Sequence, residues 1–465
     1  MKVELALLVD FGSTYTKITL VDLQVERIIG TAKAFTTVET NILQGLQQAC
    51  TDLQARLGID PLTAGHKVAC SSAAGGLKMV AVGLVRELTV EAAKLAALGA
   101  GARVLEAFAH QLTTAEILRM ESLKPDIILL AGGTDGGNRD VLVQNAKLLA
   151  KANLKVPIVA AGNKVAAEEV GEILRGAGLD CRIAENVMPE LNKLNVEPAR
   201  VTIREIFLEK IVSAKGLSQA EQLLDGVLMP TPAAVLNGAI LLAQGTPRES
   251  GIGELVLVDV GGATTDVHSV AKGDPSKAGI MYKGLPEPLA KRTVEGDLGM
   301  RYSCKALCEA AGANRFRGLL GAQGYDRIEA FLDKVTANPE YLPMNEQEEL
   351  LEEGMAKIAV ELAMERHAGS LEVVYTPFGA CYIQYGKDLT PVTNLIGTGG
   401  IIVNHQDPAR ILKAAWFNQA NPISLRPEHP RMWVDREYIL AAMGLLGEIF
   451  PDTALRLAKQ SLVEL

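Results

Sequence analysis

Two stretches of the chain share one design: LLVDFGSTYTK at residues 7–17 and VLVDVGGATTD at residues 256–266. In each, an apolar run ends in an aspartate, a turn of small residues follows, and a second β-like run begins. This order predicts a strand, a tight turn and an antiparallel strand. Because the two hairpins lie about 250 residues apart in a chain of 465, the sequence predicts two domains of related design.

The patterns around these hairpins indicate how the chain is organised. We expect the first domain at residues 1–245 and the second at residues 246–465, joined at the polar segment QGTPRESGIG (244–253). Within the first domain, apolar runs such as DIILL (126–130) alternate with helical patterns, which favours a parallel sheet. The sequence therefore predicts an α/β insertion at about 76–225, and a C-terminal connecting helix in the second domain.

The second half has weaker patterns. Its spacing predicts helices at Pro288–Arg301 and Gln347–Arg366, and its composition predicts a strand at Glu372–Thr376. We interpret the acidic stretch Glu346–Glu353 as a solvated helix face, with partner docking as the alternative.

Composition limits the class of protein. With 48% hydrophobic and 22% charged residues, the chain has the balance of a globular protein with a sizeable core. The formal net charge of −9 argues against nonspecific binding to nucleic acid or to an anionic membrane. The longest membrane-like stretch, Gly226–Pro247, is interrupted by prolines and is too short in its apolar part to span a bilayer. Together with six scattered cysteines, these features predict a soluble cytoplasmic protein without nucleic-acid or membrane partners.

The first turn contains the groups that a phosphate site needs. Asp10 ends the apolar run, and the small residues after it expose backbone N–H groups that can surround a phosphate. Hydroxyl and ammonium groups can add further contacts. The nucleotide-binding residues predicted here are Gly12, Ser13, Thr14, Thr16 and Lys17. Taken alone, such a stretch is also typical of an ordinary β-turn.

The second turn repeats this construction after Asp259. Asp10 and Asp259 together are predicted to hold a hydrated Mg²⁺, which takes one or two carboxylates, phosphate oxygens and water. The alternative is two ordinary hairpins whose aspartates cap turns, which leaves the shared design unexplained. The nucleotide-binding residues predicted here are Gly261, Gly262, Ala263, Thr264 and Thr265.

A third loop follows the apolar run at 391–396. Its residues Gly397, Thr398, Gly399 and Gly400 would let a flat nucleoside ring approach the backbone. A glycine turn between a strand and a helix is an equally good interpretation of this loop alone.

The order of the three loops resembles the phosphate-one, phosphate-two and adenosine motifs of the actin, sugar-kinase and heat-shock chaperone ATPase superfamily. The segments at 230–238 and 440–444 resemble the two connecting helices of that superfamily. The resemblance implies an α/β fold of two ribonuclease-H-like domains around a nucleotide cleft, which binds ATP or ADP with Mg²⁺.

A narrower resemblance covers nearly the whole chain. The segments LLVDFGSTYTK, ILLAGGTDGGN (from Ile128), VLVDVGGATTDVHSV (from Val256) and NLIGTGGIIVN (from Asn394) are similar to the L-type accessory proteins of glutamate mutase. This resemblance implies ATP-driven reactivation or assembly of an adenosylcobalamin-dependent mutase as client. The chain has no D-x-H-x-x-G segment of the kind that binds cobalamin, so the corrinoid would belong to the client.

The mechanism expected from these residues is that of a slow ATPase. Asp10 and Asp259 position Mg²⁺ through water, and Asp259 or Asp266 orients the attacking water. One alternative is a small-molecule kinase of the same superfamily with Asp135 or Asp297 as base. Another is a filament-forming protein that uses the nucleotide only structurally.

Two further features keep alternatives open. The glycine loop at 132–138 precedes a predicted helix, so it is either a second anion or client site or a tight turn. Cys304 and Cys308 share one helix face; they are interpreted as buried thiols, with an iron–sulfur cluster between subunits as the alternative. The six histidines lack the spacing of a zinc site.

Overall fold

A computed structural model of the chain describes residues 4–12, 15–36, 42–72, 77–213, 223–377 and 379–465. Two of the predicted site residues, Ser13 and Thr14, lie outside the described residues. The chain forms two units. Unit 1 comprises Met1–Gly238, Gly284–Pro288 and Leu440–Leu457, and unit 2 comprises Ala239–Lys283, Leu289–Ile439 and Ala458–Leu465. The domain boundary near residue 245 stays a prediction.

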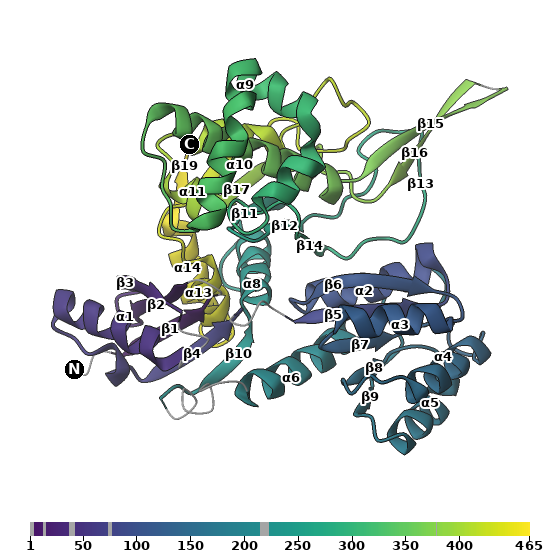
Figure 1. The fold of residues 1–465 in the computed structure, drawn as a ribbon. Helices are drawn as coiled ribbons and strands as arrows, with labels where there is room; N and C mark the ends of the chain where they lie inside the picture. Colours follow the sequence, from purple (N-terminus) through teal and green to yellow (C-terminus); the bar gives the residue numbers. More distant parts are fainter. Residues whose placement is uncertain (1–3, 13–14, 37–41, 73–76, 214–222, 378) are drawn as a thin grey trace. The chain divides into compact units, whose positions relative to one another are not determined.

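Unit 1 is built on a five-stranded sheet with the order β10-β4-β1-β2-β3 (Figure 1). Strand β1 is central and buried along its whole length, because its apolar run LALLVDF is covered on both faces. It pairs antiparallel with β2 and parallel with β4. The strands are β1 (Leu5–Phe11), β2 (Tyr15–Asp22), β3 (Arg27–Phe35), β4 (His66–Ser71) and β10 (Gly226–Pro230).

Unit 2 repeats this topology. Its main sheet has the order β14-β12-β11-β17-β18-β19, in which β11 pairs antiparallel with β12 and parallel with β17. Apart from β19, the strand order and directions are those of the sheet in unit 1. The strands are β11 (Leu255–Val260), β12 (Thr265–Val270), β14 (Ala290–Glu295), β17 (Asn394–Thr398), β18 (Arg431–Asp435) and β19 (Leu462–Glu464). Two α/β sheets of one design confirm the predicted fold class.

The long connection between β4 and β10 contains a second, fully parallel sheet with the order β6-β5-β7-β8-β9. Its strands are β5 (Lys78–Gly83), β6 (Arg103–Ala109), β7 (Ile127–Leu130), β8 (Ile158–Ala160) and β9 (Cys181–Ile183). The associated helices are η2 (Arg86–Val90), α2 (Glu91–Gly99), α3 (Thr114–Leu123), α4 (Asp140–Lys151), α5 (Lys164–Gly176) and α6 (Glu197–Ser213). An α/β subdomain thus lies between β4 and β10, and the predicted insertion at about 76–225 stays a prediction.

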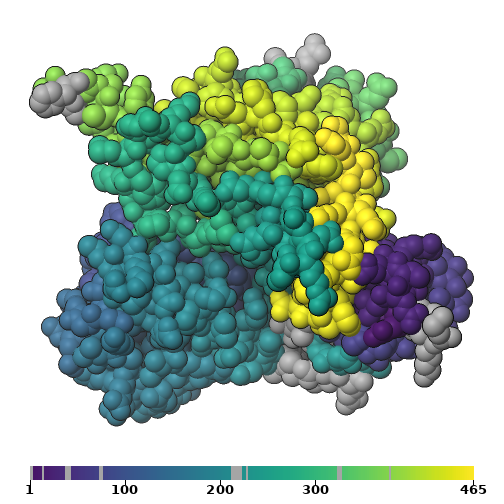
Figure 2. Space-filling model, turned by 180° about the vertical axis from the view of Figure 1, so that it is seen from behind, coloured from purple at the N-terminus to yellow at the C-terminus, as the bar shows by residue number. Residues whose placement is uncertain are grey.

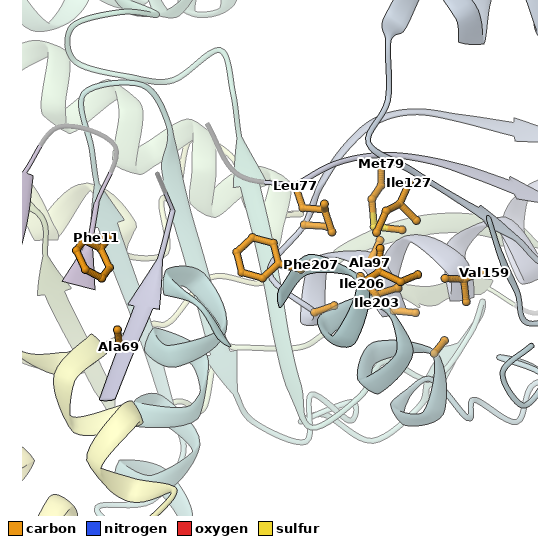
Figure 3. Packing of buried hydrophobic residues seen from close by; sticks show 14 of the residues in the cluster. Phe11, Ala69, Leu77, Met79, Ala97, Ile127, Val159, Ile203, Ile206 and Phe207 are labelled. Carbon is orange, nitrogen blue, oxygen red and sulfur yellow. The ribbon is translucent and has the colours of Figure 1, made fainter. Parts of the chain in front are cut away.

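One hydrophobic core joins the two sheets of unit 1. Phe11 and Ala69 come from the first sheet, and Met79, Ile127 and Val159 come from the inserted sheet, yet all belong to one buried cluster (Figure 3). Helices α2 and α6 contribute to the same cluster, with Ala97, Ile203, Ile206 and Phe207 labelled in the figure. Residues that share a dry core move together more readily than residues on separate cores.

Three further helices begin in unit 1, and two of them come from the C-terminal part of the chain. They are α8 (Thr231–Gln244), α13 (Leu440–Gly447) and α14 (Pro451–Ser461). Glycines let α8 and α13 cross closely: a Cβ at Gly444 would lie 1.8 Å from the carbonyl oxygen of Ala234. Arg456 of α14 pairs with Glu26, and Figure 2 shows the yellow C-terminal residues against the purple N-terminal ones.

The rest of unit 2 consists of helices and a small three-stranded sheet. The remaining strands are β13 (Ile280–Tyr282), β15 (Ser370–Thr376) and β16 (Gly379–Tyr385). Its helices are α9 (Cys304–Ala337), α10 (Glu346–His367), α11 (Gly400–Asn404), α12 (Pro408–Leu412) and η3 (Lys413–Ala415). In unit 1, α1 (Ile42–Leu57) and η1 (Pro61–Thr63) complete the fold. Of the described helices, none is long and apolar enough to span a bilayer.

Two predictions for the second half are wrong. The helix expected at Pro288–Arg301 is instead strand β14, which pairs with β12. The acidic stretch is not solvated throughout: Glu346 and Glu349 are exposed, but Glu348, Glu352 and Glu353 are buried. Lys334 Nζ lies 2.7 Å from Glu348, Arg301 pairs with Glu352, and Arg410 Nη2 lies 3.1 Å from Glu353, which also pairs with Lys357 one helical turn away.

Candidate functional site

The first hairpin turns where the sequence predicts it. The N–H of Gly12 donates to the carbonyl oxygen of Tyr15 at 3.1 Å, and Asp10 stands opposite Lys17 in the β1–β2 register. A Cβ at Gly12 would lie 2.6 Å from that carbonyl oxygen. Only glycine fits this position without a shift of the backbone.

Asp10 is held on both of its carboxylate oxygens. The Oγ1 hydroxyl of Thr231 donates to Oδ1 at 2.6 Å, and the Cys70 thiol lies 3.6 Å from the same oxygen. Lys17 Nζ is 3.5 Å from Oδ2. Burial, followed by the charge of Asp10, raises the pKa of the Cys70 thiol well above its usual value, so this group is a neutral donor. The carboxylate is only 7% exposed and has one fixed orientation.

Thr231 and Cys70 are missing from the predicted site. Cys70 stands opposite Asp10 in the β1–β4 register, and Thr231 is the first residue of α8. The predicted residue Thr16, by contrast, is fully buried, and its hydroxyl lies 3.1 Å from that of Thr36. Its hydroxyl therefore belongs to the packing between β2 and the segment after β3.

The second hairpin has the same geometry as the first. The N–H of Gly261 donates to the carbonyl oxygen of Thr264 at 2.9 Å, as Gly12 does to Tyr15. Asp259 stands opposite Asp266, whereas its counterpart Asp10 stands opposite a lysine. The two hairpins thus share this closing hydrogen bond and differ in the charge across from the aspartate.

The carbonyl groups of the second turn accept hydrogen bonds from residues 300–303. Gly261 accepts from the N–H of Met300 at 3.0 Å, Gly262 accepts from the N–H of Arg301 at 2.7 Å, and Ala263 accepts from the Ser303 hydroxyl at 2.8 Å. Within the described parts of the chain, no residue accepts a hydrogen bond from the N–H groups of residues 262–264. Successive backbone donors of this kind form an anion-binding nest.

Asp266 and Thr265 face inward. Asp266 accepts from Arg292 Nε at 2.8 Å on Oδ1 and from the Thr264 hydroxyl at 2.9 Å on Oδ2. The Thr265 hydroxyl donates to the carbonyl oxygen of Leu298 at 2.6 Å. His268, two residues on, is buried, and its burial, followed by the charge of Arg292, lowers its pKa to about 3. Asp266 is therefore engaged in a buried ion pair next to a neutral histidine.

The third loop lies beside the second. Thr398 stands opposite Asp259 in the parallel β11–β17 register, so the loops after both strands share one edge of the sheet. The Thr398 hydroxyl donates to Asp435 at 3.2 Å, and Gly397 packs on Ile402. A Cβ at Gly399 would lie 2.7 Å from Asp259 Oδ1. The second and third loops are thereby adjacent in unit 2.

Gly399→Ala is expected to destabilise this edge. Gly399 has φ of 91°, and an added Cβ would also lie 2.4 Å from the carbonyl oxygen of Val260. Strain of this kind costs on the order of 1–3 kcal/mol. Thermal unfolding of Gly399→Ala should therefore show a lowered midpoint. Gly400→Ala is the matched control, because nothing lies within 4 Å of its Cβ position; equal midpoints for both variants would contradict this account.

Each of the two turns, taken by itself, has one aspartate as a candidate magnesium ligand. No group of three or more potential ligands among His, Cys, Asp and Glu occurs in the described residues. Mg²⁺ usually keeps several waters and takes one or two carboxylates together with phosphate oxygens. Asp10 in unit 1 and Asp259 in unit 2 each offer one such carboxylate at the mouth of a turn.

The other candidate groups are engaged elsewhere. Burial opposes the ionised form of Asp135, but hydrogen bonds from Asn186 and Lys164 lower its pKa overall. Asp297 accepts from Arg366 at 2.7 and 2.9 Å. Cys308 is a free thiol, and burial raises its pKa to about 12. The two aspartates are therefore engaged in hydrogen bonds, and the Cys308 thiol is protonated.

Comparisons with known proteins agree over nearly the whole chain. A family model described as "MutL protein" matches residues 6–462. Protein MutL of Clostridium tetanomorphum is 54% identical over 458 residues, which are 98% of this chain and 99% of that protein.

The solved structures that resemble the chain include sugar kinases. Gluconate kinase of Lactobacillus acidophilus has a TM-score of 0.35 and 10% identity, with 100% of this chain and 93% of that chain covered. Glycerol kinase of Plasmodium falciparum with ADP has a TM-score of 0.35 and 9% identity, with 98% and 92% covered.

Proposed function

The chain belongs to the MutL protein family, and on that premise we propose that it is a slow ATPase that reactivates or assembles an adenosylcobalamin-dependent mutase such as glutamate mutase. It acts in the cytoplasm, and the mutase is its client. The observation that carries this proposal is the pair of hairpins with matched turn geometry, each with an aspartate at its mouth. Such turns suit the polyphosphate of ATP.

In this proposal each loop contacts a different part of the nucleotide. The N–H groups of residues 262–264 bind phosphate oxygens, and Gly12, Lys17 and the residues beside them supply the contacts in unit 1. The third loop, from Gly397 to Gly400, receives the adenosine. When bound, Mg²⁺ would neutralise charge on the phosphate oxygens, with Asp10 and Asp259 as its carboxylates. Asp259 orients the attacking water.

Asp266 has a different role in this proposal from the one first expected. Both of its oxygens are occupied, by Arg292 and Thr264, so it holds the hairpin in shape. Asp259 is half-exposed and is the better candidate to contact water. The kinase alternative needs a free base, and both of its candidates, Asp135 and Asp297, already have partners.

The proposal is tested in two steps. Binding of ATP with Mg²⁺ to the purified chain is measured by calorimetry, and phosphate release is measured with and without purified glutamate mutase. The chain is then used to capture partners from native extract without nucleotide, with ATP and with ADP. We expect recovery of a cobalamin-dependent mutase in one nucleotide state and not in the others. Failure to bind ATP would overturn the nucleotide role, and equal recovery in every state would overturn the ATP-driven cycle.

A further inference from the structure

We propose that Thr231 is a positioning residue. A shift of the Asp10 carboxylate is transmitted through the Thr231 hydroxyl to the inserted sheet, β5–β9. The inference rests on the proposed function, because it needs Asp10 to respond to Mg²⁺ and nucleotide. It goes beyond that function by naming the contact through which the nucleotide site acts on the inserted subdomain. All the residues involved lie in unit 1.

The first contact is the short hydrogen bond between Thr231 Oγ1 and Asp10 Oδ1, at 2.6 Å. Lys17 approaches the other oxygen at 3.5 Å, so a cation that reaches Asp10 from the turn competes with Lys17 on Oδ2. Oδ1 then remains with Thr231. A rotation or displacement of the carboxylate must therefore either move the Thr231 hydroxyl or break its hydrogen bond.

The second contact joins the start of α8 to the inserted subdomain. Gly101, in the turn between α2 and β6, has φ of 89°, and a Cβ there would lie 2.8 Å from Pro230 Cβ and 3.4 Å from the N of Ala233. The backbone of this turn thus lies directly against the ring of Pro230, the last residue of β10, and close to the backbone of the first turn of α8. Pro230 and Pro232 flank Thr231, and their fixed φ angles make this segment stiff.

The turn that carries Gly101 is itself fastened to the inserted sheet. Gly101 N–H donates to Leu98 at 3.0 Å, and Arg103 N–H donates to Leu77 at 2.7 Å. On its other side, the C-terminal end of α2 packs on Arg200 of α6. A displacement of Pro230 therefore reaches α2, β6 and α6, which share the core shown in Figure 3. This path consists of direct contacts between packed groups, which can carry coupling between sites when the groups have two arrangements.

Hydrogen exchange of the full chain tests the inference. Amide exchange in α2 and β6 (residues 91–109) is compared with and without saturating Mg²⁺ and a non-hydrolysable ATP analogue. We expect the analogue to change protection there in the wild type and in Thr231→Ser, which keeps the hydroxyl. In Thr231→Val, which is similar in shape but cannot donate, the change should fall by about fivefold. Thr51→Val is the control, because the Thr51 hydroxyl donates to the carbonyl oxygen of Gln47 in its own helix.

The outcomes separate this inference from the proposed function. If the wild type binds the analogue but its protection in residues 91–109 does not change, the coupling is wrong and the nucleotide role stands. The same holds if Thr231→Val binds the analogue and keeps the full change. If the wild type binds no analogue, the proposed function fails and the inference fails with it. Thermal unfolding without nucleotide shows whether Thr231→Val folds. If it does not, the same exchange measurement on Thr231→Ala, compared with the wild type, decides whether the coupling needs the hydroxyl.

Discussion

Asp259→Asn is expected to abolish phosphate release while ATP binding remains measurable. The asparagine keeps the size of the side chain but cannot carry the negative charge that orients water and binds hydrated Mg²⁺. Removal of a group of this kind costs on the order of 10²–10⁴ in rate. Binding persists because the backbone N–H groups of residues 262–264 and the third loop are unchanged by the substitution.

The measurement is single-turnover hydrolysis of radiolabelled ATP, combined with calorimetry of nucleotide binding. Asp274→Asn is the matched control, because Asp274 is an exposed aspartate of unit 2 outside the three loops; its rate should equal that of the wild type. Hydrolysis by Asp259→Asn at the wild-type rate would remove Asp259 from the mechanism. Loss of binding together with loss of turnover would instead assign Asp259 to nucleotide affinity.

The hairpins were predictable because their signals are local. An apolar run, an aspartate and a glycine turn lie within about ten residues. Glycine suits both turns because a Cβ would lie 2.6 Å from a carbonyl oxygen at Gly12 and 3.0 Å from one at Gly261. The related design of the two sheets follows from the same segments, since β1 and β11 are the central strands of each. Here local sequence and global fold agree, as expected for a minimally frustrated chain.

The partners of Asp10 could not be predicted, because they come from distant segments. Thr231 is 221 residues away and Cys70 is 60 residues away, and nothing in the residues beside Asp10 indicates either one. The one feature that sets Thr231 apart is that it begins a helix directly after a strand. Pairing between remote strands is set by tertiary packing, which a local pattern does not contain.

The two wrong predictions in the second half have the same cause. In β14, Lys291 and Arg292 break the apolar pattern, although both side chains are buried through pairing with β12 and through bonds to remote groups. In α10, Glu348 and Glu352 were predicted to be solvated because their cationic partners, Lys334 and Arg301, lie outside the helix. Charged residues mark solvent only when no remote partner neutralises them.

The ion pair between Asp266 and Arg292 leads to the second large effect. Asp266→Ala is expected to destabilise unit 2 by about 3–5 kcal/mol, because it leaves a buried guanidinium without its carboxylate. The Arg292 side chain is only 4% exposed. The neighbouring His268, whose pKa is lowered to about 3 by burial and by the charge of Arg292, is neutral and offers no negative charge in place of the carboxylate. The expected readout is a lowered midpoint in both thermal and urea unfolding, with Asp259→Asn close to the wild type.

Replacement of both Asp266 and Arg292 distinguishes a role of Asp266 in stability from a role in hydrolysis. Asp266→Leu combined with Arg292→Met removes both charges and should recover most of the lost stability, because no buried charge is then left unpaired. If Asp266 only holds the hairpin, the double variant hydrolyses ATP at a rate near that of the wild type. If instead it regains stability but not hydrolysis, Asp266 contacts the reacting water, and the assignment of that role to Asp259 alone is wrong.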